Sequence, residues 1–258
     1  MASFDDLAPG EPLTVSATLY TTYRQCPQQA LGRLQGLYPP TTRASFKGSL
    51  AHRIFARHLQ SGPIETDEFE LVCRREAGSN LGEAMASLHM KPSEFRAVVA
   101  EIADLYEQFD AIPLDGFVEA EAPLEVMPAP GVRLRGRVDA VFQEDPNAGV
   151  RIVDWKTGVD LSGAGPQLDF YAMAWAEVHG SQPALLEALS IRTGEKVVRT
   201  PTDTEVDRVR DDVVSMIAEL RAAIETGVDL QRTAGPHCRW CPLLDDCVEG
   251  STAMQILA

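Results

Sequence analysis

Asp139, Asp154 and Lys156 are the residues whose types and spacing are most informative about chemistry. Asp154 follows Asp139 by fifteen positions, and Lys156 stands two positions further on. Two carboxylates held close together repel each other unless a cation lies between them, so such a pair is typical of a site for a hard divalent metal, Mg²⁺ or Mn²⁺. A lysine beside the metal could hold an attacking water or neutralise charge on a phosphate in the transition state, and both uses indicate phosphodiester hydrolysis. The alternative is an Asp–Lys surface pair on an edge strand, which is common and contributes little energy.

The segments that carry these residues have the pattern of neighbouring β-strands. Residues 132–142 alternate between polar and apolar types, and a second extended run, 150–157, follows a segment rich in Asp, Pro, Asn and Gly. This pattern predicts a hairpin or a close strand pair. Because strand side chains alternate between faces, Asp154 and Lys156 are expected to point the same way and Trp155 the opposite way.

The rest of the chain predicts helices before and after this sheet. Residues 16–37, opened by a Ser or Thr cap, and 47–59 have helical periodicity. Residues 66–110 are expected to be largely helical, with breaks near Gly78 and Lys91-Pro92. Further strands are expected at 117–127, 185–192 and 196–200, and further helices at 166–178 and 203–226. The order indicates an α/β fold with a central mixed β-sheet flanked by helices, divided as a helical part (16–110), a catalytic sheet core (117–200) and a C-terminal helix and tail (203–258) within a single domain spanning 1–258.

Three further residues are candidates for the same site. Gln167 and Tyr171 are four positions apart near the start of a predicted helix, where they could orient the lysine or a phosphate. The alternative is that Tyr171 packs in the core and Gln167 is only a first-turn residue. His52 lies on an early helix, after small residues that permit close approach of another element, and could be a third metal ligand, although a single histidine on a helix is usually not one.

The cysteines form a second group with the spacing of metal ligands. Cys238, Cys241 and Cys247 make a C-x2-C-x5-C array in a chain with only five cysteines. Cys26 is the better fourth ligand because Cys26-Pro27 resembles Cys241-Pro242, whereas Cys73 lies in a helical context that suits a buried thiol. This spacing accommodates zinc and an iron-sulfur cluster equally well.

Composition and charge limit the class of protein. The chain has 258 residues, of which 45% are hydrophobic and 24% charged, as expected of a globular protein. No apolar run approaches the length of a membrane span, and the N-terminus lacks a signal sequence, so we expect a cytoplasmic protein that does not interact with membranes. A net charge of −15 excludes a protein that coats nucleic acid by charge alone.

The charge is unevenly distributed along the chain. Residues 1–60 carry a net charge of +3, and residues 61–130 carry −11. Arg133, Arg135 and Arg137 alternate along one predicted strand face, which indicates either a basic stripe for a phosphate chain or an ordinary solvated face.

Six segments of the chain together resemble a known family. They are residues 16–27, 48–52, 136–139, 153–158, 167–171 and the last three cysteines, and they occur in the family's order. On these motifs the chain resembles the RecB-type nucleases of the PD-(D/E)xK superfamily, in particular the iron-sulfur branch that includes CRISPR-associated exonucleases and the AddB nuclease domain. The resemblance implies a restriction-endonuclease-like core with a C-terminus clamped by cysteines.

The resemblance also implies a role for each candidate residue. His52, Asp139, Asp154 and the Trp155 carbonyl would bind Mg²⁺ or Mn²⁺, Lys156 would position or activate water, and Gln167 and Tyr171 would support the site. Cys26, Cys238, Cys241 and Cys247 would hold a 4Fe-4S cluster with a structural role, and zinc is the less favoured occupant.

The function expected from the sequence is a metal-dependent DNA nuclease, in particular an exonuclease on single-stranded or end-containing DNA. Two alternatives are a non-catalytic DNA-binding or scaffold subunit of a repair or CRISPR adaptation complex, and an iron-sulfur redox protein. The chain has no nucleotide-binding motif of the type G-x4-G-K followed by Ser or Thr, so unwinding of duplex DNA would need a partner such as a helicase.

Overall fold

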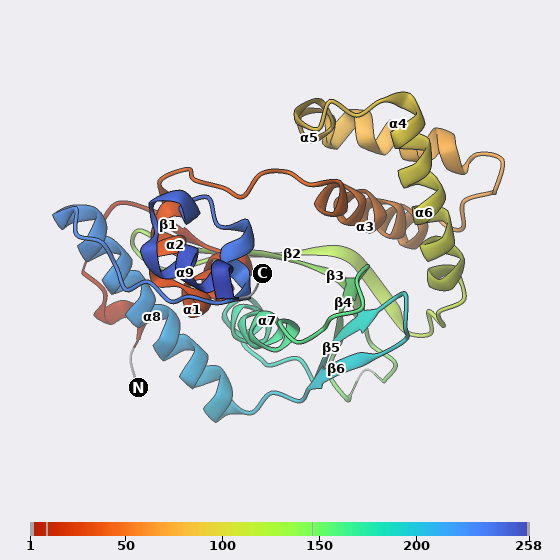
Figure 1. Cartoon of the computed structure of the whole chain (residues 1–258). Helices are drawn as coiled ribbons and strands as arrows, with labels where there is room; N and C mark the ends of the chain where they lie inside the picture. The colour runs from red at the N-terminus through yellow and green to blue at the C-terminus, as the bar shows by residue number, and fades with distance from the viewer. Residues whose placement is uncertain (1–2, 9, 146, 257–258) are drawn as a thin grey trace.

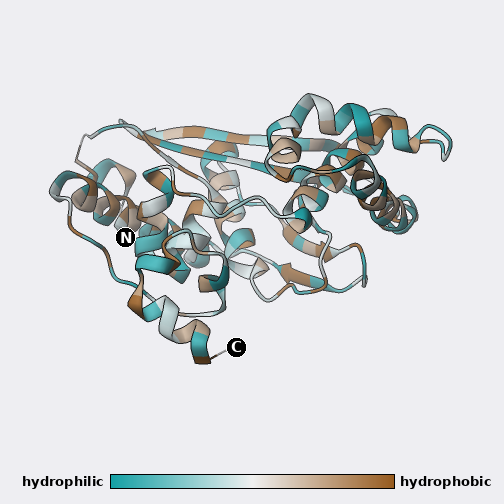
Figure 2. Ribbon diagram, turned by 45° about the horizontal axis from the view of Figure 1, so that its top comes forward, coloured by the Kyte–Doolittle hydropathy of each residue, from teal (hydrophilic) through white to brown (hydrophobic). Residues whose placement is uncertain are grey.

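A six-stranded mixed β-sheet forms the centre of the computed structural model, which describes residues 3–8, 10–145 and 147–256 (Figure 1). The strands are β1 (Leu13–Val15), β2 (Phe117–Ala129), β3 (Val132–Phe142), β4 (Arg151–Lys156), β5 (Leu185–Ser190) and β6 (Lys196–Arg199). The sheet order is β1-β3-β4-β5-β6, and β2 pairs with β3 as well. Figure 2 shows polar and apolar residues interleaved along the long strands, the pattern expected of a strand with two different faces.

The strand β3 changes its partner along one edge. Antiparallel β2 pairs with it from Val132 to Phe142, so β1 and β4 must share the opposite edge. Parallel β1 pairs with the first three residues of β3, and antiparallel β4 pairs with the last three, Ala140 to Phe142. Asp139 therefore lies where β3 and β4 begin to separate, and its side chain has room between the strands.

Helices cover both faces of the sheet. They are α1 (Ala17–Gln25), α2 (Pro27–Leu34), α3 (Arg43–Ser61), α4 (Phe69–Asn80), α5 (Gly82–Ser87), α6 (Pro92–Asp110), α7 (Ala164–His179), α8 (Asp203–Thr226) and α9 (Val248–Ile256). In Figure 1, α3 to α6 gather at one end of the molecule and α1, α2, α8 and α9 at the other. No helix among the described residues combines the length and the apolar character needed to cross a membrane.

Two apolar cores, one on each face, fix the orientation of β4. Ile152 packs in the core formed with α1, α7 and α8, whereas Val153 and Trp155 pack in the core formed with α3 and α6. The intervening Asp154 is directed to the α7 face, as the alternation of strand side chains requires. Burial of the neighbouring apolar side chains therefore determines which way the carboxylate points.

Several element predictions were wrong. The helix expected at 16–37 is two helices, because Pro27 has no N–H and forces the preceding Cys26 into an extended conformation with φ of −159°. The break expected near Gly78 lies at Leu81, between α4 and α5, whereas the break at Lys91-Pro92 is confirmed. Strand β1 and helix α9 were missed.

Candidate active site

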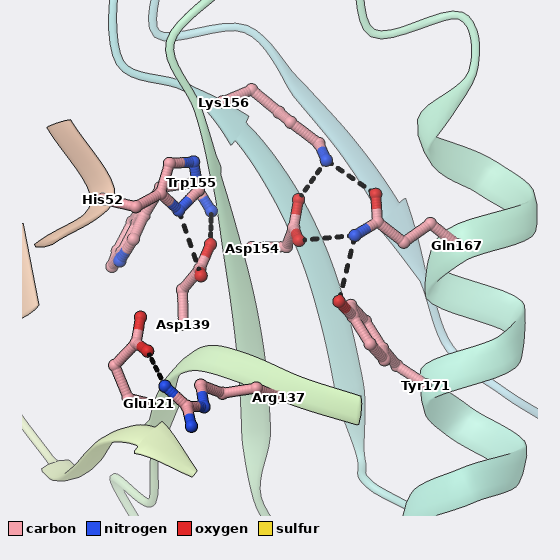
Figure 3. A network of polar contacts seen from close by, with 9 residues as sticks. All are labelled: His52, Glu121, Arg137, Asp139, Asp154, Trp155, Lys156, Gln167 and Tyr171. Carbon is pink, nitrogen blue, oxygen red and sulfur yellow. Dashed lines mark hydrogen bonds and ion pairs between the residues drawn. The ribbon is translucent and has the colours of Figure 1, made fainter. Parts of the chain in front are cut away.

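Asp139 connects three elements at the point where β3 and β4 separate (Figure 3). Its Oδ2 accepts a hydrogen bond of 2.7 Å from the backbone N–H of Trp155 in β4. Its Oδ1 lies 3.1 Å from Nδ1 of His52 in α3. The Asp139 carboxylate thus accepts the Trp155 N–H that a backbone carbonyl of β3 would otherwise accept, and it also holds the His52 ring against the sheet.

Asp154 and Lys156 lie on the same side of β4 and face α7. Lys156 Nζ lies 2.7 Å from Asp154 Oδ2 and donates a hydrogen bond of 2.6 Å to Gln167 Oε1. Gln167 Nε2 donates to Asp154 Oδ1 and to the hydroxyl of Tyr171, both at 3.0 Å. One amide therefore fixes the carboxylate and the ammonium relative to each other.

Trp155 confirms the alternation expected along β4. Its indole packs edge-on against Phe109 of α6, with ring centroids 5.4 Å apart, on the face opposite to Asp154 and Lys156. Its backbone N–H points to Asp139. Because N–H and C=O of one strand residue point to the same edge, the Trp155 carbonyl is also directed to the gap between β3 and β4.

Tyr171 satisfies both roles considered for it. Its ring is buried in the core next to Phe170, with centroids 6.4 Å apart. Its hydroxyl meets Gln167 at the edge of the site. Burial raises the pKa of Tyr171, and the Asp154 charge adds to this effect, so the phenol stays neutral and acts only through hydrogen bonds.

Two carboxylates lie near each other in the site, and each faces one basic side chain, Asp154 that of Lys156 and Asp139 that of His52. Burial raises the pKa of Asp154 to about 6, and the nearby Asp139 carboxylate contributes in the same direction against the opposing effect of Lys156. Burial lowers the pKa of His52, but the charge and hydrogen bond of Asp139 outweigh this effect and raise it to about 8. Two adjacent carboxylates that resist joint ionisation indicate a site for a positive ion.

The donor set fits a hard divalent cation. Asp154 Oδ2 is buried and, despite its ion pair with Lys156, accepts no hydrogen bond of good geometry. Carboxylate oxygens, a backbone carbonyl and an imidazole are ligands that Mg²⁺ and Mn²⁺ accept. Among the described residues, however, no three His, Cys, Asp or Glu side chains are positioned as a metal-binding group. In this arrangement Lys156 lies against Asp154, and His52 is bonded to Asp139.

The raised pKa of Asp154 gives a prediction about stability. Between about pH 4 and pH 6 the folded protein binds a proton at Asp154 that the unfolded chain releases, so this carboxyl stabilises the fold at low pH and loses that contribution as pH rises through 6. In EDTA and above pH 6, Asp154→Asn should be more stable than the wild type, with a free energy of unfolding higher by up to about 3 kcal/mol. Urea unfolding at several pH values measures this difference. The difference should shrink towards pH 4.

A matched control is Asp104→Asn, which changes an exposed carboxylate on α6. This variant should show no comparable increase in stability over the same pH range. A wild type that equals or exceeds Asp154→Asn in stability above pH 6 would show that burial and the Asp139 charge do not destabilise the ionised Asp154 as described.

The four cysteines predicted as ligands come together at the other end of the molecule. Cys26 at the junction of α1 and α2 lines one small cavity with Cys238, Cys241 and Cys247 of the tail. A Cβ atom on Gly250 would lie 3.4 Å from Cys247 Sγ and 3.5 Å from Cys238 Sγ, so the missing side chain leaves room beside both sulfur atoms. Cys73 is buried apart from them in α4, as expected of a structural thiol.

The surroundings of these thiols suit bound thiolates. The N–H of Gly235 donates to Cys238 Sγ at 3.4 Å, and the N–H of Gly250 donates to Cys247 Sγ at 3.3 Å. Burial raises the pKa of Cys241, and the charges of the other three cysteines raise it further. A cation among them would reverse this effect, because a coordinated thiol is deprotonated.

The arginines of β3 do not form an uninterrupted basic stripe. Arg137 Nη1 lies 2.8 Å from Glu121 of β2, and Arg133 Nε lies 3.7 Å from Glu125 of the same strand. Glu121 also has a positive φ of 56° and lies between the pairs Ala120–Ala140 and Ala122–Val138, which places it opposite Asp139. The Glu121–Arg137 pair was not predicted, although the register of the hairpin formed by β2 and β3 brings the two residues close together.

Comparison with known proteins identifies the class of this fold and site. A profile of the PD-(D/E)XK nuclease superfamily matches residues 14–248. The chain therefore belongs to this superfamily, and the prediction of a restriction-endonuclease-like α/β fold is confirmed.

One solved structure shares the fold over most of its length, and a second matches more weakly. A crystal structure from Eubacterium rectale, described as a candidate exonuclease, is 13% identical with a TM-score of 0.54, over 90% of this chain and 86% of the other. The crystal structure of SSO0001 is 13% identical with a TM-score of 0.35, over 78% of this chain and 94% of the other. No curated protein matches the chain.

Proposed function

We propose that this nuclease is a Mg²⁺- or Mn²⁺-dependent deoxyribonuclease that acts as an exonuclease on single-stranded or end-containing DNA. The proposal rests on the proximity of Asp139, Asp154 and Lys156 in the sheet, where the last residues of β4 lie beside the interior of β3. The similar structure described as an exonuclease supports the mode of action, since it shares the fold over most of both chains.

Asp139, Asp154, His52 and the Trp155 carbonyl are the residues proposed to hold the metal. His52 and the Trp155 backbone contact Asp139, and the charges of Asp139 and Asp154 interact with each other. When bound, such a metal supplies a hydroxide nucleophile at neutral pH and stabilises negative charge on the phosphate. The protein contributes the position of the donors, which buried side chains and backbone hydrogen bonds keep fixed.

Lys156 is proposed to act on the reacting water and phosphate. Its ammonium group is held between Asp154 and Gln167 and is partly exposed, so one of its three hydrogens remains for a water or a phosphate oxygen. In the reaction it would orient the attacking water in line with the scissile bond and neutralise charge that develops on phosphorus. Gln167, held in turn by Tyr171, keeps the ammonium in place.

The four cysteines are proposed to hold a 4Fe-4S cluster with a structural role, with zinc as the alternative. The tail already docks on α2, because the N–H of Gln28 donates to the Gln231 carbonyl at 3.1 Å and its side chain binds Asp229 at 3.2 Å. A cluster would fasten the same two segments, which are 212 positions apart at Cys26 and Cys238. The cysteine site lies apart from the catalytic group, which is Asp139, Asp154, Lys156, Gln167 and Tyr171, and it takes no part in the proposed cleavage.

The nuclease proposal is tested with purified protein, Mn²⁺ and three DNA substrates. We expect mononucleotides or short products from end-labelled single-stranded DNA, slower release from blunt duplex DNA and no cutting of circular single-stranded DNA. Linearisation of the circle would show endonuclease action. Absence of cleavage of all three substrates, with the protein folded and the metal present, would contradict the assignment as an active nuclease.

A further inference from the structure

A cavity lined by three arginines lies beside the candidate active site. It has a volume of about 170 Å³, and its lining is Arg53, Ala56, Arg57, Gln60, Glu76, Glu121 and Arg137. Arg53 follows the candidate ligand His52 in α3, and Arg137 is two residues before Asp139 in β3, about 6.6 Å along the strand. The cavity therefore adjoins the catalytic group without containing its residues.

The helix α3 is unusually basic for this acidic chain. It contains Arg43, Lys47, Arg53 and Arg57 and no acidic residue between positions 43 and 61. Arg43 and Lys47 are ion-paired with Glu101 of α6, at 2.7 and 2.5 Å. These two basic residues at the start of the helix are therefore already neutralised.

Arg53 and Arg57 differ from them in having no counterion. They are one helical turn apart, and within the described residues neither guanidinium makes a hydrogen bond or an ion pair. Of the two acidic residues that line the cavity, Glu121 is paired within it with Arg137 at 2.8 Å, and Glu76 accepts a hydrogen bond from Asn80 at 3.3 Å. In the described part of the chain, neither is paired with Arg53 or Arg57. Two unpaired guanidinium groups in one cavity offer the forked donors that phosphate oxygens accept.

We propose that this cavity is a phosphate-binding subsite, in which Arg53, Arg57 and Arg137 hold a phosphate of the substrate strand next to the one that is cleaved. The inference rests on the proposed nuclease function and names how the strand is positioned. An anion would draw Arg137 away from Glu121 and would bind Arg53 and Arg57 directly. The subsite would give a chain with a net charge of −15 a local positive region beside the reacting group, where a phosphate can bind.

The test measures binding separately from cleavage. A fluorescein-labelled single-stranded oligonucleotide is titrated with protein in EDTA, and anisotropy gives the affinity at several salt concentrations. We expect Arg57→Ala and Arg53→Ala each to weaken binding about tenfold. Each variant should also reduce the slope of log K against log salt by roughly 0.7, the value for one lost phosphate contact on a single strand.

The matched control is Arg96→Ala, which removes an exposed arginine of α6 that also lacks a partner among the described residues and lies outside the cavity. It should bind as the wild type does. Thermal unfolding of each variant checks that the fold is retained. Oligonucleotides with a 5′-phosphate and a 5′-hydroxyl distinguish the source of the ligand: equal losses indicate a phosphate within the backbone, and a loss confined to the phosphorylated strand indicates a terminal phosphate.

Two results would overturn the subsite. One is a wild type without measurable binding, and the other is a pair of arginine variants with unchanged affinity and salt slope. Cleavage assays on the same proteins distinguish a failure of the phosphate subsite from a failure of the nuclease proposal. A wild type that cleaves while the arginine variants bind normally leaves the function standing, and a wild type that does not cleave while the variants lose binding leaves the subsite standing.

Discussion

Replacing Lys156 with alanine should lower the rate of DNA cleavage at least about a hundredfold while the protein remains folded. The ammonium group is fixed by Asp154 and Gln167 at 2.7 and 2.6 Å, so its charge is already in position when charge develops on the phosphate. Alanine removes that charge and leaves Asp154 without its counterion. Single-turnover cleavage of labelled single-stranded DNA in saturating Mn²⁺ measures the effect, with circular dichroism as the check on folding.

Lys196→Ala is the matched control for this substitution. Lys196 also lies in the sheet, on β6, and pairs with a carboxylate, Glu187, at 3.3 Å, but it is not part of the catalytic group. Its removal should change the cleavage rate less than about twofold, as for a surface ion pair. Full metal-dependent activity in Lys156→Ala would refute the role assigned to the lysine.

The second large effect is expected at the cysteine site. Cys241→Ser should lose the visible absorbance of the purified protein and much of its solubility, because the proposed cluster would lose one of its four ligands. The loop closed between Cys26 and Cys238 spans 212 positions, and in the chain-entropy description its release costs about 5 kcal/mol. For a protein of this size that corresponds to a fall in melting temperature on the order of 10 °C.

Cys73→Ala controls for the loss of a thiol elsewhere. Cys73 is buried in α4, away from the cysteine cavity, so this variant should keep the visible spectrum. Metal analysis by mass spectrometry decides between the two occupants. A stable, colourless wild type that contains zinc would overturn the iron-sulfur proposal, and a Cys241→Ser variant with an unchanged spectrum and melting temperature would exclude that residue as a ligand.

The local geometry of the site could be predicted because a strand has a period of two. This period alone places Asp154 and Lys156 on one face and Trp155 on the other, and the buried neighbours of β4 enforce the same orientation. The four-residue spacing of Gln167 and Tyr171 likewise predicts one helix face, and the hydrogen bond between them confirms it.

Contacts between distant segments could not be derived in this way. The contact of His52 with Asp139 joins residues 87 positions apart, and the local pattern around His52 indicated only a possible third ligand until the family resemblance was considered. Strand β1 has three residues and forms only because β3 offers a parallel edge, so no local pattern marks it. The cavity of Arg53 and Arg57 depends in the same way on α3 packing beside β2 and β3.

Local chemistry was also misjudged at Cys26. Helical periodicity continues across residues 16–37, and the prediction gave it more weight than Pro27. A proline at the first position of a helix is favourable there, but it forces an extended residue before it. The break between α1 and α2 places Cys26 at the cysteine cavity. Giving too little weight to Pro27 therefore led both to the wrong prediction of one long helix and to the missed role of the break.

The most direct test of the account is the dependence of DNA cleavage on Mn²⁺ in the wild type and in Asp139→Asn. This substitution keeps the size of the side chain but removes the carboxylate shared by α3, β3 and β4. If Asp139 holds the metal, wild-type cleavage should rise with Mn²⁺, stop in EDTA, and be lost in the variant at every metal concentration. Cleavage that persists in EDTA, or that Asp139→Asn retains in full, would show that a metal at Asp139 is not required.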